Sequence, residues 1–250
     1  MVVFEFKDFN QLYHDLSRLP CLKYDKYKNE LTRTGSTYHM KNVIIHTTSY
    51  ECDIRMDKLN YTISKWKTLV NKYIDQDDYM KLKERLSKND KKTATFNFKI
   101  HNGDKQGCLI ALVFTRDDTK KPWDCVNCYY RTFDTYKAFP CDLILLNRMF
   151  TELPNCHIIN IYLHVPNVFW RIQFLSELIG GYFSLEEFNQ DNFACNHVKE
   201  LYNSYYGEGA EEVKLHSIAR KQRLKKRENP LPEIKIEDLK LFDMYETKLF

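Results

Sequence analysis

The stretch 130–142 gathers side chains that suit the binding of a phosphorylated compound with a polar ring. It reads Tyr-Arg-Thr-Phe-Asp-Thr-Tyr-Lys-Ala-Phe-Pro-Cys-Asp. The guanidinium of Arg131 and the hydroxyl of Thr132 are donors that match phosphate oxygens. The carboxyl groups of Asp134 and Asp142 can hydrogen-bond a polar ring. The sequence therefore predicts a site in which neighbouring residues hold both phosphate and ring.

Cys108 is the candidate nucleophile. It opens an apolar run that predicts a buried strand over 108–115. A thiol at the start of a strand is held rigidly, and its thiolate can form a covalent intermediate with a substrate. Such a role needs a lowered thiol pKa, which we expect Arg131 to provide. The alternative is that Cys108 is an ordinary core thiol, since the chain has eight cysteines without a framework of spacings.

The order of residues in 130–142 resembles the signature of the thymidylate synthase and deoxycytidylate hydroxymethylase family, Arg-Ser-x-Asp-x-x-x-Gly-x-Pro-x-Asn. Four positions match it or carry a similar residue: Arg131, Thr132 in place of Ser, Asp134 and Pro140. Two positions differ: Ala138 stands in place of Gly, and Asp142 in place of the Asn of the synthases. The resemblance implies an α+β fold, in which a mixed sheet is flanked by helices and one sheet face forms a homodimer interface.

The same resemblance implies roles for residues outside this stretch. Cys108 would add to carbon 6 of a pyrimidine and make carbon 5 nucleophilic, although Gly and Leu flank it where the family has Pro and His. Arg33, in an Arg-Thr-Gly triplet, resembles an arginine that binds the nucleotide phosphate. The other matches are Lys91 and Lys92, which stand where an arginine pair reaches the partner subunit's phosphate, and Asn160 and Tyr162, which resemble a His-x-Tyr that holds the sugar 3′-hydroxyl. For the two lysines, a solvated turn is an equal alternative.

Asp142 bears on the identity of the base. Uracil presents an N3–H donor beside an O4 acceptor, which an Asn side chain matches. Cytosine presents a bare N3 beside an N4 amino donor, which a carboxyl group with one shared proton matches better. A buried site built on hydrogen bonds rejects the wrong base strongly. The resemblance points the same way, because the hydroxymethylases of the family use Asp at this position. The alternative is that Asp142 caps a helix beginning at Leu143.

The main functional hypothesis is an enzyme that transfers a one-carbon group from 5,10-methylenetetrahydrofolate to carbon 5 of deoxycytidylate, with Asp134 positioning cofactor or ring. Methylation of deoxyuridylate is the close alternative. A non-catalytic nucleotide-binding homologue is the third, because the span between Arg33 and Cys108 is shorter than in the family and leaves its active-site glutamate unplaced. Glu84 is the nearest helical candidate for that glutamate and Trp66 for a stacking residue, but helix surface and core are the simpler explanations.

Composition favours one globular domain over 1–250 that acts in the cytoplasm. The net charge of +4 is mild, and the basic run 220–227 lies between glutamates in an expected helix over 211–228, so a nucleic-acid partner is disfavoured. The N-terminus lacks a signal-peptide pattern, and no run approaches the roughly 18 apolar residues of a membrane span. Cys125 and Cys128 form a CxxC pair without the further ligands that a zinc site needs, so we expect no metal.

The pattern of apolar residues places the expected elements. Helical spacing predicts helices over 5–19, 59–87 (as one or two helices), 142–153 and 169–179. Alternating or β-branched runs predict strands over 38–50, 93–100, 108–115, 125–133, 158–165 and 233–236. Because helices and strands mix without regular βαβ alternation, the α+β class is favoured.

Overall fold

The computed structural model describes residues 1–19, 32–34, 37–56, 61–99, 108–135, 139–171 and 232–242. The expected helix 211–228 with its basic run, Ala138, and all of the expected helix 169–179 beyond residue 171 lie outside the described residues.

The described strands form one mixed sheet of eight strands. Its main order is β1-β3-β8-β6-β5-β4, with β2 paired to β3 and β7 paired to β8. The pairs β1–β3, β6–β8 and β7–β8 are parallel, and the others are antiparallel. The strands are β1 (Val2–Phe6), β2 (Thr32–Thr34), β3 (Thr37–Thr47), β4 (Thr93–Asn97), β5 (Leu109–Thr115), β6 (Trp123–Tyr130), β7 (Phe133–Asp134) and β8 (Cys156–Arg171).

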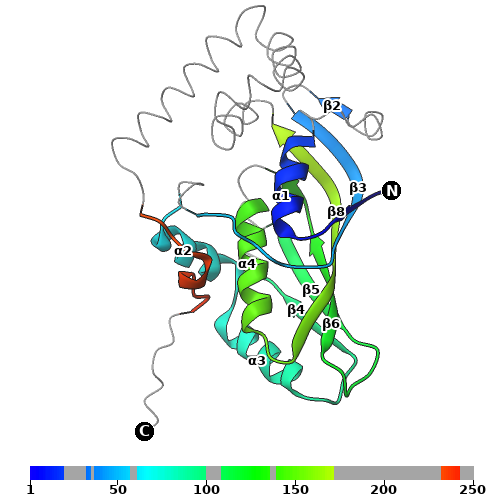
Figure 1. Cartoon of the computed structure of the whole chain (residues 1–250), viewed down its shortest axis with the longest axis vertical. Coiled ribbons are helices and arrows are strands. Elements are labelled where there is room, and N and C mark those ends of the chain that lie inside the picture. Colours follow the sequence, from blue (N-terminus) through cyan, green and yellow to red (C-terminus); the bar gives the residue numbers. More distant parts are fainter. Residues whose placement is uncertain are drawn as a thin grey trace, which may run out of the picture.

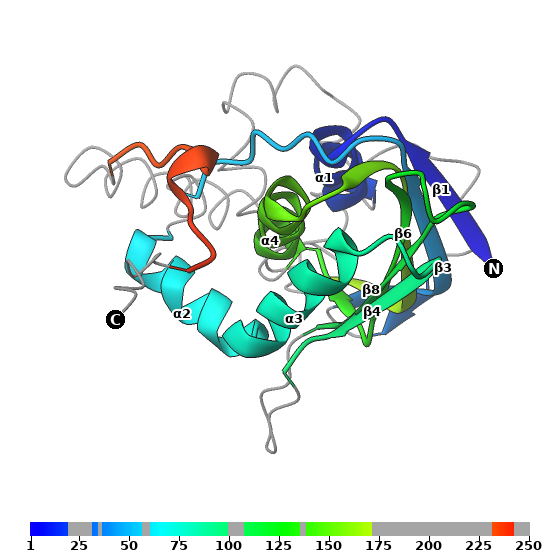
Figure 2. The same ribbon diagram turned by 90° about the horizontal axis from the view of Figure 1, so that it is seen from below.

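The described helices are α1 (Phe9–Arg18), α2 (Ile63–Tyr73), α3 (Gln76–Ser87) and α4 (Phe139–Glu152). All of them lie on one side of the sheet, and α4 runs through the middle of that layer (Figures 1 and 2). α4 is apolar on nearly all of its faces and is buried from Phe139 through Asn147. A helix with this pattern needs neighbours all round, and the sheet, the other helices and the C-terminal segment provide them.

Short polar residues begin the three helices that lie around α4. Asp8 accepts a hydrogen bond from the backbone N–H of Gln11 at the start of α1, and Thr62 caps α2 in the same way. Asp75 caps α3 by accepting from two backbone N–H groups. Since Asp75 follows the last residue of α2 by two positions, the cap explains why the predicted helix 59–87 is two helices.

Arg116 closes the end of the sheet where β5 leads into β6. Its side chain is 4% exposed, and its guanidinium lies 4.1 Å from the centre of the Trp123 ring. It donates four hydrogen bonds, to the carbonyl oxygens of Lys88, Lys91 and Lys121 and to Oδ1 of Asn89. The buried cation is therefore matched by acceptors on two loops.

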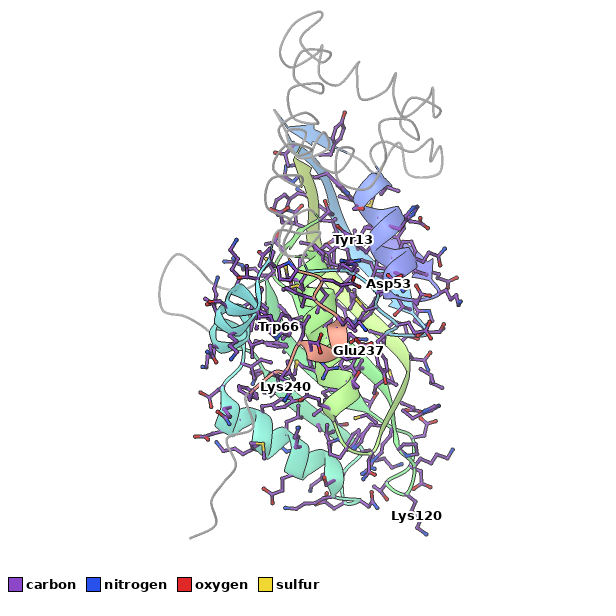
Figure 3. The ribbon with its side chains drawn as sticks, turned by 60° about the vertical axis from the view of Figure 1, so that its left-hand side comes forward. Tyr13, Asp53, Trp66, Lys120, Glu237 and Lys240 are labelled. Carbon is purple, nitrogen blue, oxygen red and sulfur yellow. The ribbon has the colours of Figure 1, made fainter. Side chains whose placement is uncertain are left out.

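The segment 232–242 packs across the helical layer. The indole Nε1 of Trp66 donates to the carbonyl of Lys240 at 2.8 Å, and these two residues lie close together in Figure 3. The guanidinium of Arg148 on α4 donates to the carbonyl of Leu239 at 2.8 Å. The segment thus ties α2 to α4.

The α+β class is confirmed, and three predicted elements are wrong in part. The N-terminal region begins with a strand, β1, before α1. The expected helix from 169 is a continuation of β8 to Arg171, because β3 and β7 extend the ladder past Pro166. Residues 233–236 form no strand; a single 3₁₀ turn covers Ile236–Asp238. Within the described ranges, no helix has the length and apolar character to cross a membrane.

Candidate functional site

Four side chains from distant parts of the chain meet where α2, β5, β6 and α4 come together. We call them the Asp142 cluster: Tyr73, Cys108, Tyr130 and Asp142. They are close enough to alter one another's pKa. The backbone N–H of Cys108 donates to the Tyr73 hydroxyl at 3.0 Å, and the carbonyl of Cys108 accepts from the N–H of Arg131 at 2.8 Å. Cys108 is therefore held on both sides.

Asp142 lies at the centre of the cluster, in the first turn of α4. Its side chain is 1% exposed, and neither carboxyl oxygen has a hydrogen-bond partner among the described residues. The Tyr73 hydroxyl lies near enough to lower the carboxyl's pKa, as does Lys72, but it does not reach ordinary hydrogen-bonding geometry. Burial dominates and raises the pKa of Asp142 to about 8. At neutral pH this side chain is a neutral acid, with one donor and one acceptor.

The alternative role of Asp142 as a helix cap is wrong. α4 begins at Phe139, so Asp142 lies inside the helix rather than before it. An N-cap residue uses its side-chain oxygen to accept from the N–H groups of the first turn. The oxygens of Asp142 accept no such bond. A helix-starting role therefore does not explain this buried carboxyl.

Tyr130 provides a second polar group without a partner. Its hydroxyl is buried and makes no hydrogen bond within the described part of the chain. Burial, followed by the proximity of Asp142, raises its pKa, and the same two causes raise that of Tyr73. Buried polar groups in folded proteins are nearly always hydrogen-bonded. Two such groups in one cluster indicate a place built for a polar ligand.

Cys108 is half-buried, and its thiol is not activated in this structure. Burial raises the pKa of Cys108 to about 12, with Asp142 the next cause. Arg131 and Lys72 oppose this shift, and Asp134 adds to it. The expectation that Arg131 alone would lower the thiol pKa is therefore wrong, because burial outweighs the cation.

The residues that follow β6 lie beside this cluster. Arg131 is exposed, and Asp134, on β7, is buried. The hydroxyl of Thr132 already donates its proton to the carbonyl of Asn167 at 3.2 Å. In this arrangement Thr132 can accept a hydrogen bond but cannot donate one to phosphate. Arg131 and Asp134 remain the charged groups that border the cluster.

Asn160 and Tyr162 lie elsewhere. They occupy the face of β8 that points away from the helices, alternating with the buried Ile161. Tyr162 stacks on His46 with ring centres 4.7 Å apart, and Oδ1 of Asn160 is 3.3 Å from Nε2 of the same histidine. Tyr162 also lies seven residues before Phe169, the partner of Asp134, which is roughly 23 Å along the strand. Nothing brings this pair to Cys108.

The predicted phosphate-binding residues divide between the two ends of the sheet. Lys91 and Lys92 precede β4, whose first residue pairs with Thr115, at the opposite end of β5 from Cys108. Their carbonyls accept from Arg116. Arg33 on β2 pairs with Tyr38, which pairs with Trp170. By backbone register, Arg33 therefore lies at the same end of the sheet as Asp134.

Sequence reasoning missed Tyr73, Tyr130 and Lys72, because nothing in their local sequence distinguishes them from core or surface residues. The weaker candidates have structural roles. Trp66 is buried with its indole bonded to the C-terminal segment, and Glu84 is exposed and paired with Lys88 at 2.7 Å. In the described ranges, no three His, Cys, Asp or Glu side chains come together as a metal site.

Comparison with known proteins gives no name to this arrangement. No protein-family model matches the chain, and no curated protein matches it.

Proposed function

We propose that this protein binds a pyrimidine nucleoside monophosphate and transfers a one-carbon group to carbon 5 of the base, in the manner of a deoxycytidylate hydroxymethylase. The observation that carries the proposal is Asp142, a buried carboxyl with two oxygens lacking partners, in the same cluster as the thiol of Cys108. The resemblance of 130–142 to the thymidylate synthase and hydroxymethylase signature supports the same chemistry.

A neutral Asp142 carboxyl complements cytosine. Its hydroxyl donates to the bare N3, and its carbonyl oxygen accepts from the N4 amino group. The raised pKa of Asp142, about 8, keeps this protonated form present at neutral pH. Uracil would place its N3–H against the acid hydroxyl and its O4 against an oxygen, which leaves polar groups unpaired. The pairing therefore favours deoxycytidylate over deoxyuridylate.

Cys108 would supply the nucleophile. Its sulfur adds to carbon 6, carbon 5 becomes nucleophilic and gains the one-carbon unit, carbon 5 then loses its proton, and the thiolate leaves. Water supplies the hydroxyl of a hydroxymethyl product. A base paired with Asp142 keeps that carboxyl neutral, which removes one of the causes that hold the thiol protonated. Nucleotide binding thus eases ionisation of Cys108.

Arg131 is the proposed phosphate ligand within the protomer, and the backbone position of Arg33 is compatible with a second. Lys91 and Lys92 would act only across a dimer, on the partner's phosphate. The roles proposed for Thr132 as a phosphate donor, and for Asn160 and Tyr162 at the sugar, gain no support from the contacts described above.

The proposed one-carbon donor is 5,10-methylenetetrahydrofolate, which supplies the carbon when bound. Asp134 is the residue offered for it. A buried carboxyl that accepts from adjacent N–H groups suits a pterin ring in kind, and Asp134 borders Cys108.

A homodimer is proposed through the sheet face that points away from the helices. Five gaps of about 4.8 Å between the six main strands, and about ten residues along β8, give a face of roughly 800 Å². That area is about what one partner contributes to a stable interface.

The experiment is the release of tritium from carbon 5 of labelled dCMP and dUMP, with and without 5,10-methylenetetrahydrofolate. We expect release from dCMP that is lost in Cys108→Ser and shifted toward dUMP in Asp142→Asn. Release from dUMP alone in the wild-type protein would reverse the assignment of the base.

A non-catalytic nucleotide-binding protein is the second candidate, and the protonated thiol of Cys108 favours it. It predicts dCMP binding that depends on Asp142, together with no tritium release from either nucleotide. Calorimetric titration of dCMP into the wild-type protein, Cys108→Ser and Asp142→Asn separates the two candidates.

A further inference from the structure

The sheet face that points away from the helices carries two complete rows of side chains across all six main strands. Their order follows from the strand register and from the alternation of buried and unburied residues. The first row is Glu5, His46, Tyr162, Asn127, Val113 and Thr95. The second row is Val3, Ile44, His164, Tyr129, Ala111 and Asn97.

These two rows differ from the rest of the chain in charge. The whole sequence is 29% charged, whereas Glu5, at the edge strand, is the only Asp, Glu, Lys or Arg in either row. A solvated sheet face normally alternates apolar side chains with charged ones. The rows also lack the cations that a nucleic-acid backbone needs. A face of this kind can meet a second copy of itself, because no like charges are brought together at its centre.

His164 lies in the middle of this face. Its ring stacks on Tyr129 with centres 4.8 Å apart and an interplanar angle of 11°. Its Nε2 is 2.8 Å from Oδ1 of Asn127, which can only accept, so Nε2 carries a proton. Ile44 of β3 lies on its other side. Burial lowers the pKa of His164, which favours the uncharged ring.

The groups around His164 offer no countercharge. On β6 it faces Tyr129 and Asn127, on β3 it faces Ile44 with His46 diagonal to it, and on β8 its same-face neighbour is Tyr162. His46 differs, because Glu5 is its direct partner on β1 and can balance a charge there.

We propose that His164 is a proton switch for the association of two copies of this chain through the sheet face. The proposal rests on the proposed homodimer. With His164 neutral, the two faces pack together. With His164 protonated, two cations approach each other across the two-fold axis in a region without anions, and the dimer separates.

The direction of the pH effect follows from linkage. Packing a second copy over His164 removes more water from the ring, so its pKa in the dimer is lower than in the monomer. The separated protomers then bind protons more readily than the dimer does. Dimer stability is fully present above the monomer's pKa and is lost as the pH falls through the pKa of the dimer.

The test is the dimer dissociation constant of the full chain, measured by sedimentation velocity between pH 7.5 and 5.5. We expect it to rise about tenfold or more, because each dimer takes up two protons. His164→Gln stays neutral and should give a flat profile. His46→Gln is the matched control in the neighbouring row and should keep the wild-type slope.

Each outcome decides one point. A wild-type dimer whose dissociation constant does not change overturns the switch alone. A slope that persists in His164→Gln, with circular dichroism confirming the fold, also overturns it. A chain that is monomeric at every pH overturns the proposed dimer together with the switch. Calorimetric binding of dCMP at pH 7.5 tests the nucleotide site separately, so its failure is not confused with failure of the switch.

Discussion

Arg116 and Asp142 are both buried and ionisable, and their surroundings are opposite. Arg116 donates four hydrogen bonds and stacks on Trp123. Asp142, at the other end of β5, has no hydrogen-bond partner among the described residues. Removing a charge from water is costly unless hydrogen bonds replace those lost to the solvent. The protein meets this cost at Arg116 and leaves it unmet at Asp142.

This difference separates a structural site from a ligand site. The acceptors around Arg116 come from the protein's own loops, so the arginine is satisfied in the absence of any ligand. The Asp142 cluster lacks an equivalent set of partners, and the raised pKa of its carboxyl is the measurable consequence. Natural proteins retain unsatisfied buried groups chiefly where function requires them.

The largest effect is expected for Arg116→Met. The change leaves three buried carbonyls without a donor and removes the stacked cation, so we expect the free energy of unfolding to fall by about 4 kcal/mol. Urea denaturation at pH 7 measures it. Arg85→Met on the exposed face of α3 is the control, with an expected change within about 0.5 kcal/mol. Equal effects of the two variants would remove the structural role assigned to Arg116.

Asp142→Asn should change how stability depends on pH. Between about pH 4 and pH 8 the folded wild-type protein holds a proton on Asp142 that the unfolded chain has lost. Its free energy of unfolding should therefore fall by about 1.4 kcal/mol per pH unit relative to the variant. Urea denaturation of both proteins at pH 5, 6 and 7 should show about 3 kcal/mol of divergence. Parallel profiles would mean that the carboxyl is hydrogen-bonded or hydrated in solution.

The smallest effect concerns two buried tyrosines whose hydroxyls both lack partners, Tyr130 in the cluster and Tyr79 on α3. If the cluster receives a nucleotide, Tyr130→Phe should weaken dCMP binding about fivefold, as expected for the loss of one hydrogen bond. Tyr79→Phe should leave the affinity unchanged. Isothermal titration calorimetry compares them. A loss of affinity in both variants would indicate a general loosening of the core.

Much of the sheet could be predicted from the sequence, because its strands alternate apolar and polar residues. The run before Cys108 and the strands β4 and β5 fall near their predicted positions for that reason. The prediction failed at Phe169, where an aromatic-rich segment has helical spacing but continues β8. Pairing with β3 and β7 decides its conformation, and such long-range partners leave no local pattern.

The candidate site was predicted only where its residues are contiguous. Arg131, Asp134 and Asp142 lie in one stretch, and the structure places them near Cys108. Tyr73 comes from a helix far earlier in the chain, and only the tertiary fold brings its hydroxyl to the backbone of Cys108. Asn160 and Tyr162 show the converse, since a three-residue pattern can match while its strand presents both side chains to the opposite face.

The attachment of the segment 232–242 sets the order in which the site can be completed during synthesis. Trp66 and its partner Lys240 are 174 residues apart in the chain, so ribosomal elongation separates their appearance by roughly 10 to 35 seconds. Throughout that interval α2, which carries Tyr73, lacks this anchor. The Asp142 cluster should therefore mature only after the C-terminal segment has left the ribosome, and a stalled nascent chain would hold Cys108 without its tyrosine support.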